Sequence, residues 1–295
     1  MNVSERLTLL RQEMMINGLD FYLVPSIDAH NSEYVPACWE RRAWISGFDG
    51  SAGEVLVTLD HAYLWTDGRY FLQAEQQLDS QHYSMMKQIG FVPEVNKWLS
   101  ENAEGKCLGV DPRVISTGKA KAFMELLKKC KGEFISLEEN LVDKCKVKLG
   151  ESLTLPSSEA FALDIKYTGQ TRTERLDWLR GRLADKKVDA IALNALDEIA
   201  WLFNIRGADV DFNPLVISYA LVSADEICLF VDAHKINAEL KIELKAASVS
   251  LYAYEDFGKH LSDLKGKVWL DPKTANYWME SKLVGEAYFE ASPIV

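Results

Sequence analysis

The chain has 295 residues and a formal net charge of −11 at pH 7, with 48% hydrophobic and 26% charged residues. This is an ordinary soluble composition, and the length predicts about two domains. The acidic balance argues against non-specific nucleic-acid binding and against binding to an anionic membrane surface, because both depend on Lys and Arg.

Cysteine usage and the N-terminal sequence indicate the compartment. There are five cysteines, an odd number, with no C-x-x-C pair, so a disulfide framework is not expected. The N-terminus lacks the pattern of a signal peptide, and no run approaches the ~20 apolar residues of a membrane span. We therefore expect a cytoplasmic protein without a membrane or nucleic-acid partner.

The first 140 residues alternate between helical and strand patterns. Ser4 is a plausible N-cap for a helix through Ile16, and Pro93 suits the first turn of a later helix. The expected helices are the first one, Tyr70–Leu78, Pro93–Glu101 and Thr117–Lys129. The expected strands are Phe21–Val24, the hairpin Glu54–Leu59 with Ala62–Thr66, and then His82–Lys87, Cys107–Val110 and Glu133–Ser136.

The second half repeats the first. Leu7 and Met14 have apolar counterparts in Leu176 and Leu183, at a constant offset of 169 residues. In each half a strand ends in Asp-Pro, at Asp111-Pro112 and Asp271-Pro272. The second copy is expected to contain strands at Ala190–Asn194, Leu215–Val222, Glu226–Asp232 and Lys267–Leu270, a helix or turn at Ile199–Asn204, helices at Asn237–Leu244 and Asp256–Leu264, and a final helix from Lys273.

The repeat length indicates two homologous domains, because solenoid units run about 20–50 residues. Strands that alternate with helices and include a hairpin predict an α/β fold with a mixed sheet in each copy. We expect a first domain over residues 1–140, a linker over 141–172 and a second domain over 173–295.

The sequence offers no recognisable catalytic constellation and no metal-ligand spacing. It has no H-E-x-x-H motif, G-x-S-x-G elbow or P-loop. The glycines of Phe48–Gly53 precede a strand rather than a helix, so a phosphate-cradling loop is not expected there. Neither a catalytic residue nor a bound cofactor is therefore assigned to these 295 residues.

Two segments carry more polar chemistry than surface loops require. Asp28–Tyr34 places Asp, His, Asn and Glu directly after a strand, where ligand-facing loops of α/β sheets lie. His30 and Glu33 are therefore candidates for a binding cleft, and the alternative is an Asx-type loop in which the backbone satisfies His30.

The second segment is Trp65–Phe71, in which a strand ends in Asp-Gly and places Arg69 beside aromatic residues. The guanidinium of Arg69 could grip a carboxylate or a peptide carbonyl. The alternative is a turn in which Asp67 caps the next helix and Arg69 pairs with a nearby carboxylate. The residues alone leave both alternatives open.

Longer runs around these segments resemble a known family. The runs Pro25–Tyr34, Arg41–Gly53 and Trp65–Ala74 look like the first domain of three-domain, cytosolic Xaa-Pro aminopeptidases (aminopeptidase P). In the second copy, Ile199–Val210 followed by Asn213-Pro214 is similar to that family's second domain. The resemblance implies two tandem creatinase N-terminal-like domains, each a mixed β-sheet flanked by helices.

The resemblance also implies a function. In this family a third, pita-bread domain holds two metal ions, usually manganese, that activate water for hydrolysis of the bond before proline. That domain is absent from these residues, so no metal ligand can be transferred, and the segment alone is expected to be inactive. Its expected roles are to gate and contact the peptide substrate, to pack with the catalytic domain and to support a homodimer or other homo-oligomer. The arginine of the family's W-T-D-G-R-Y motif binds peptide and falls on Arg69, which Asp67 would orient, with His30 and Glu33 as weaker candidates.

Two other functions stay open at this stage. One is a stand-alone α/β binding or scaffold protein without peptidase activity. The other is a small-molecule-binding module with an activity of its own. A reading frame that continues past Val295 into a carboxylate-rich domain would favour the peptidase, and hydrolysis of an Xaa-Pro peptide by this segment with added manganese would favour an autonomous enzyme.

Overall fold

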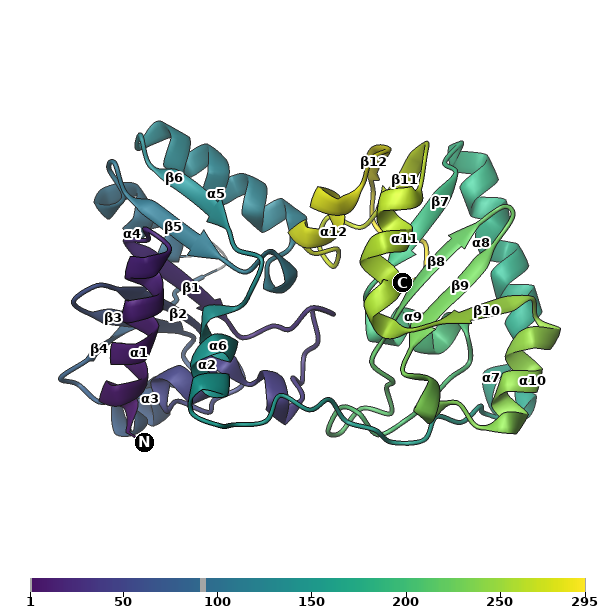
Figure 1. The fold of residues 1–295 in the computed structure, drawn as a ribbon, viewed down its shortest axis with the longest axis horizontal. Coiled ribbons are helices and arrows are strands. Elements are labelled where there is room, and N and C mark those ends of the chain that lie inside the picture. Colours follow the sequence, from purple (N-terminus) through teal and green to yellow (C-terminus); the bar gives the residue numbers. More distant parts are fainter. Residues whose placement is uncertain (1, 91–93, 295) are drawn as a thin grey trace. The chain divides into compact units, whose positions relative to one another are not determined.

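The computed structural model describes residues 2–90 and 94–294, and the chain forms two compact units (Figure 1). The first unit contains the chain up to Ile27 together with Ala37–Thr154. The second contains Asp28–Pro36 and the chain from Leu155 onward. Residues 141–172, predicted as a linker, thus contribute to the packing of both units, 141–154 to the first and 155–172 to the second.

The first unit is an α/β fold in which helices flank one six-stranded sheet. Its strands are β1 Phe21–Pro25, β2 Glu54–Thr58, β3 Ala62–Thr66, β4 Tyr83–Lys87, β5 Cys107–Val110 and β6 Glu133–Ser136. Its helices are α1 Val3–Ile16, α2 Arg41–Ser46, α3 Phe71–Gln77, α4 Glu94–Asn102, α5 Thr117–Lys129 and α6 Leu141–Lys148.

The strand order is β4-β3-β2-β1-β5-β6. Only β2 runs antiparallel to its neighbours, while the β3–β4, β1–β5 and β5–β6 pairs are parallel. The predicted hairpin is confirmed as β2 and β3, joined at Asp60-His61, where Thr58 Oγ1 donates to Asp60 Oδ1 at 2.6 Å.

The second unit repeats this topology strand for strand, in the order β10-β9-β8-β7-β11-β12. Its strands are β7 Ala190–Leu193, β8 Ser218–Ser223, β9 Ile227–Val231, β10 Val249–Tyr252, β11 Lys267–Leu270 and β12 Glu286–Phe289. Its helices are α7 Ile165–Thr168, α8 Arg172–Lys186, α9 Leu196–Leu202, α10 Ala238–Ala246, α11 Phe257–Asp263 and α12 Tyr277–Lys282. The predicted duplication of a mixed α/β sheet is confirmed.

The second sheet is buried on both faces, and alternate residues of each strand enter different clusters. On one face Ile191, Val222 and Leu229 pack with residues of α8. On the other face Tyr219 and Phe230 pack with residues of α11 and α12. Because successive side chains of a strand point to opposite faces, a nearly continuous apolar run such as Ile227–Val231 can serve both clusters at once.

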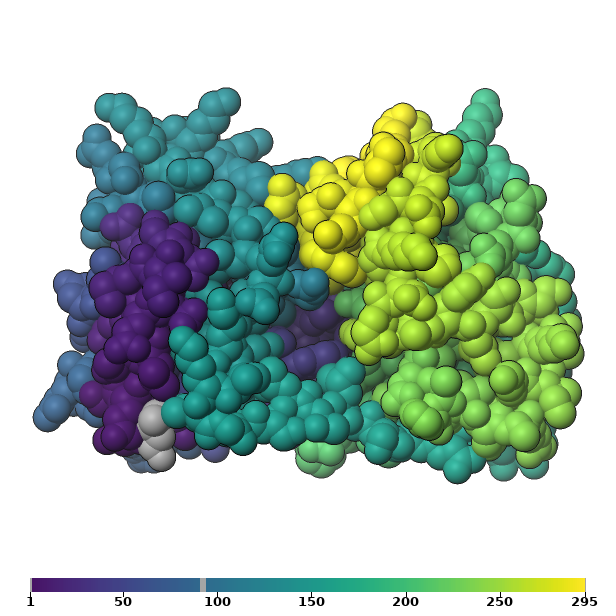
Figure 2. Space-filling view, viewed as in Figure 1, coloured from purple at the N-terminus to yellow at the C-terminus, as the bar shows by residue number. Residues whose placement is uncertain are grey.

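In the first unit α1 lies beside α6 (Figures 1 and 2), so residues far apart in sequence share one core cluster. Leu10 and Met14 of α1 pack in this cluster with Leu141 and Cys145 of α6. The buried carboxylate of Glu13, which is 2% exposed, receives Lys144 and Lys148 from α6. The apolar stripe predicted for the first helix is therefore the face that α6 and the sheet cover.

Several element ends differ from the prediction. Asn2 rather than Ser4 caps α1, through a capping box with Glu5. The last helix starts at Tyr277 rather than Lys273, because Asp271 first organises a turn by accepting from the Lys273 amide. A strand, β12, follows this helix and was not predicted. The expectation for Pro93 lies outside the described residues.

All five cysteines are free thiols. None of the helices in the described part of the chain combines the length and the apolar character that a membrane span requires.

Candidate functional site

The site predicted from sequence lies where β3 ends in the first unit. Two segments meet there, the loop 47–53 after α2 and the turn 66–70 before α3. Thr66 Oγ1 donates to the Ala52 carbonyl at 2.6 Å, and Tyr70 Oη and Ser51 Oγ are 2.6 Å apart. These two bonds fix the loop against the turn.

A buried arginine, Arg42, holds the loop 47–53 in place through hydrogen bonds. Arg42 is 7% exposed, and its guanidinium donates to the carbonyls of Phe48 and Gly50 and to Ser26 Oγ. Burial lowers the pKa of Arg42 to about 10, so the group stays protonated at neutral pH. Residue 50 must be glycine for a steric reason, because a Cβ there would lie only 2.7 Å from Tyr70 Cδ1.

On this base, Asp67 and Arg69 form a two-pronged ion pair. Arg69 Nε lies 2.9 Å from Asp67 Oδ1 and Nη2 lies 2.8 Å from Oδ2, while the Arg69 amide donates to Oδ1 at 3.0 Å. The Asp67 hydrogen bonds and charge raise the pKa of Arg69, and the same hydrogen bonds from Arg69 lower the pKa of Asp67. Both groups are therefore charged at neutral pH.

The Arg69 side chain is nevertheless open to solvent, with 68% of it exposed. Its Cζ lies 5.1 Å from the centre of the Tyr70 ring, which supports one face of the guanidinium. Nη1 makes no hydrogen bond to any side chain or backbone group in residues 2–90 and 94–294. Arg69 is thus oriented by Asp67 and retains a donor edge for a carbonyl or carboxylate. Asp67 does not cap the next helix, because α3 has no side-chain cap.

His30 and Glu33 lie in the second unit, in the segment Asp28–Pro36. His30 is 1% exposed. Its Nδ1 lies 2.8 Å from the Asn194 carbonyl and its Nε2 lies 2.8 Å from Tyr254 Oη. Both ring nitrogens are engaged inside the unit, in agreement with the structural alternative for this histidine.

The loop around His30 also has the predicted Asx geometry. Asp28 Oδ1 accepts from the amides of His30 and Ser32 at 2.9 and 3.0 Å. Glu33, in contrast, is exposed. The structure therefore brings Asp67 together with Arg69, and places His30 in a buried network of the other unit.

Metal-ligating side chains do not cluster in the described part of the chain. Within residues 2–90 and 94–294, no group of three or more His, Cys, Asp or Glu side chains could hold a metal ion. The described side chains thus offer no site for a metal pair, which the resemblance places in a third domain outside these residues.

Two family models match the chain and show its family. The model described as Creatinase/Prolidase N-terminal domain matches residues 6–147, and a second with the same description matches residues 152–295. The two matches cover the two copies of the six-stranded fold. The chain belongs to the creatinase/prolidase N-terminal domain family and contains two such domains in tandem.

Curated relatives are Xaa-Pro aminopeptidases. The chain is 40% identical over 273 residues to the probable Xaa-Pro aminopeptidase P of Laccaria bicolor, a match that covers 92% of this chain and 42% of the relative. It is 39% identical over 284 residues to Xaa-Pro aminopeptidase 1 of Dictyostelium discoideum, covering 92% of this chain and 45% of the relative. The chain thus spans less than half the length of these relatives.

A solved structure of an X-prolyl aminopeptidase is also similar to this chain. The crystal structure of X-prolyl aminopeptidase from Caenorhabditis elegans, described as a cytosolic enzyme with a di-nuclear active site, matches with a TM-score of 0.92 and 33% identity. The match covers 100% of this chain and 51% of that one.

Proposed function

We propose that this chain is the N-terminal, non-catalytic portion of a metal-dependent Xaa-Pro aminopeptidase, which removes the residue before proline from the N-terminus of a peptide. The observation that carries the proposal is the match to the C. elegans enzyme over 100% of this chain and 51% of that one, supported by about 40% identity to curated Xaa-Pro aminopeptidases. The two metal ions, manganese by family resemblance, would be held by residues outside this chain.

The proposed role of this portion is to contact and gate the peptide substrate in a cytoplasmic homo-oligomer. The geometry of Arg69 supports the contact. A guanidinium that is charged, oriented by Asp67 and still open on one edge can donate to a peptide carbonyl or carboxylate with little loss of side-chain freedom. His30 and Glu33 are weaker candidates for the same substrate, and the exposed Glu33 is the more accessible of the two.

The test is Arg69→Ala in the full-length enzyme that contains this chain. We expect KM for an Xaa-Pro peptide to rise on the order of tenfold with little change in kcat, because the lost contact binds substrate and transition state alike. Arg182→Ala removes another exposed arginine, from α8, and should leave both constants unchanged. An unaltered kcat/KM in Arg69→Ala would reject the proposed contact.

The chain alone provides a second test. Incubated with an Xaa-Pro peptide and manganese, it should show no hydrolysis, because no cluster of metal-ligand side chains occurs among the residues that the structure describes. Metal-dependent cleavage by the chain alone would contradict the assignment of this portion as non-catalytic.

A further inference from the structure

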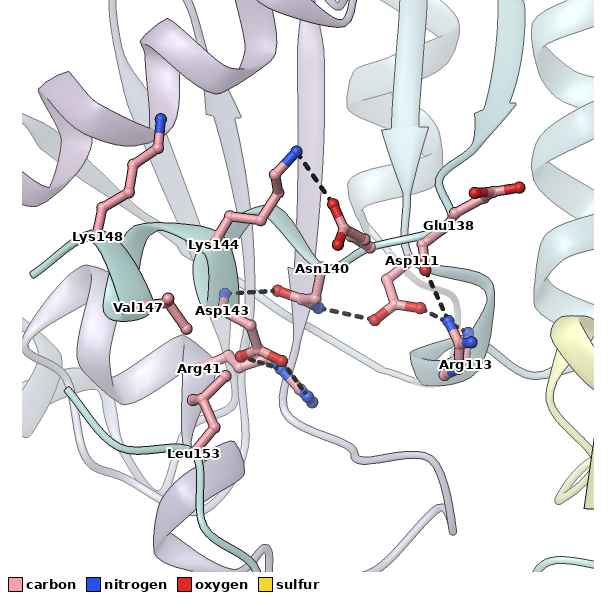
Figure 3. A pocket seen from close by; sticks show the side chains of 11 residues that line it. Arg41, Asp111, Arg113, Glu138, Asn140, Asp143, Lys144, Val147, Lys148 and Leu153 are labelled. Atoms are coloured by element: carbon pink, nitrogen blue, oxygen red, sulfur yellow. Dashed lines mark hydrogen bonds and ion pairs between the residues drawn. The ribbon is translucent and has the colours of Figure 1, made fainter. Parts of the chain in front are cut away.

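The first unit contains a pocket that the proposed function does not use (Figure 3). It is open to solvent and has a volume of about 560 Å³, within the range of small-molecule sites. It lies where β5 and β6 end, with Asp111 following β5 and Glu138 following β6. Helix α6 provides much of the remaining wall through Asp143, Lys144 and Val147.

The pocket lies next to the position that sheet topology favours for a ligand, at the end of β5. β1 is followed in the sheet by β2 on one side, whereas its parallel neighbour β5 is followed by β6 on the other. Ligands of open α/β sheets bind outside the carboxyl ends of strands, at the point where the strand order diverges in this way.

One wall of the pocket has an unsatisfied cationic donor. Arg41 binds Asp143 through Nε at 2.8 Å and Nη2 at 2.7 Å, and its side chain is only 9% exposed. Its Nη1 has no partner in the described part of the chain. A buried donor without an acceptor is costly. Because Nη1 itself is buried, a ligand oxygen in the pocket would reach it after a small shift of the Arg41 side chain, and that contact would be favoured.

Another wall has a carboxylate bound only by neutral groups. Asp111 is 3% exposed, and it accepts from the Arg113 amide and from Asn140 Nδ2, both at 2.9 Å. No Lys or Arg among the described residues of the first unit forms an ion pair with Asp111. Asn140 joins the two walls, because it also accepts from the backbone amide of Asp143 (Figure 3).

The lining as a whole selects the ligand class. Four basic and four acidic side chains surround the pocket, so it has no net charge and disfavours a polyanion or a polycation. Val147 and Leu153 add an apolar surface next to Arg41 (Figure 3). A ligand that matches all three features carries one negative group, one positive group and an aliphatic part.

We propose that this pocket binds a small zwitterion, an α-amino acid or a short peptide with an aliphatic side chain. The ligand carboxylate is directed to Arg41, its ammonium group to Asp111 and its side chain to Val147 and Leu153. A peptidase of the proposed kind releases compounds of this class, but the site is inferred from the pocket alone and does not depend on the proposed function.

The test is isothermal titration of the chain with L-leucine and glycyl-L-leucine. We expect saturable binding of at least one of them, and binding at least tenfold weaker for both N-acetyl-leucine and leucinamide, since each lacks one of the two charges. Absence of saturable heat with both zwitterions would overturn the proposal. Equal binding of the blocked compounds would overturn it as well, because it would indicate apolar adsorption alone.

Two matched variants locate the site. Val147 is 59% exposed and Ile242 of α10 is 71% exposed, so both positions tolerate a charged residue. Val147→Glu should weaken the zwitterion at least tenfold, because it places a carboxylate where the aliphatic group would lie, and Ile242→Glu should leave affinity unchanged. Unchanged affinity in Val147→Glu would exclude this pocket. Neither the titrations nor the variants depend on peptidase activity. The zwitterion proposal can therefore fail or succeed independently of the test on Arg69.

Discussion

Glu198 is a carboxyl group that the second unit withdraws from water. It is 7% exposed, and burial is the main cause that raises its pKa from an ordinary 4.5 to about 7, against the hydrogen bond from Ser292. Asp197 and Asp271 add to this rise through their charge. The protonated form is therefore favoured in the folded state over a pH range in which the unfolded chain ionises.

The sign of the pH dependence follows from this difference. Between pH 4.5 and 7 the folded state keeps a proton that the unfolded state has lost, so the free energy of unfolding falls as pH rises. Above pH 7 the loss reaches its full value of about 3 kcal/mol. Below pH 4.5 Glu198 contributes no such loss.

Glu198→Gln tests this account. The variant should unfold with a free energy up to about 3 kcal/mol higher than the parent chain at pH 8, with the difference vanishing below pH 4.5. Urea unfolding followed across this pH range measures it. Glu255→Gln, at an exposed position of the same unit, should show no comparable difference, and a pH-independent gain in Glu198→Gln would contradict the raised pKa.

At the scale of elements, α6 depends on one asparagine. Asn140 Oδ1 accepts from the amides of Val142 and Asp143, which caps the helix. Asn140 Nδ2 also donates to the buried Asp111 at 2.9 Å. The same side chain thus closes the helix and satisfies a carboxylate at the end of β5.

Asn140→Ala should therefore cost more than the loss of a cap. We expect the free energy of unfolding to fall by about 2–4 kcal/mol, about 1 from the cap and the rest from Asp111, which loses a buried partner. Asn237→Ala removes the cap of α10, whose other partner Glu159 is exposed, and should cost about 1 kcal/mol. Equal losses in chemical denaturation would show that the bond to Asp111 contributes little.

Sequence patterns predicted most elements because the information for them is local. The hairpin of β2 and β3 follows from apolar runs on either side of Asp60-His61. The strand β12 was missed because Glu286–Phe289 is a short edge strand, only partly buried. The repeat did contain the missing signal, since β6 occupies the same place in the first copy.

At the scale of the whole molecule, the candidate site also divides into contacts between residues close in sequence, which the sequence could suggest, and contacts between distant residues, which it could not. The pairing of Asp67 with Arg69 spans two residues, so the sequence could suggest it as one of two alternatives. The surroundings of His30 depend on Asn194 and Tyr254, 164 and 224 residues away. No local pattern identifies such partners, and the sequence could not decide between binding and burial.

The segment Asp28–Pro36 gives the second unit part of its polar interior. The carbonyl of Ala29 accepts from Asn194 Nδ2 at 3.1 Å and from Asn276 Nδ2 at 2.8 Å, in addition to the two bonds of the His30 ring. Two family domains in sequence are therefore not two independent segments of chain. The second unit includes nine residues that precede most of the first.

His30→Ala tests how much the second unit depends on this segment. The substitution leaves the Asn194 carbonyl and the Tyr254 hydroxyl without the ring nitrogens and creates a cavity, so the second unit should lose about 2–4 kcal/mol of unfolding free energy. Hydrogen exchange resolved by residue should show faster opening at β7 and β8, with β1–β6 unchanged. His234→Ala, at an exposed position, should leave exchange as it is. Uniform acceleration across both sheets would show that His30 stabilises more than the unit in which it lies. No acceleration would show that its bonds to Asn194 and Tyr254 contribute little to the stability of that unit.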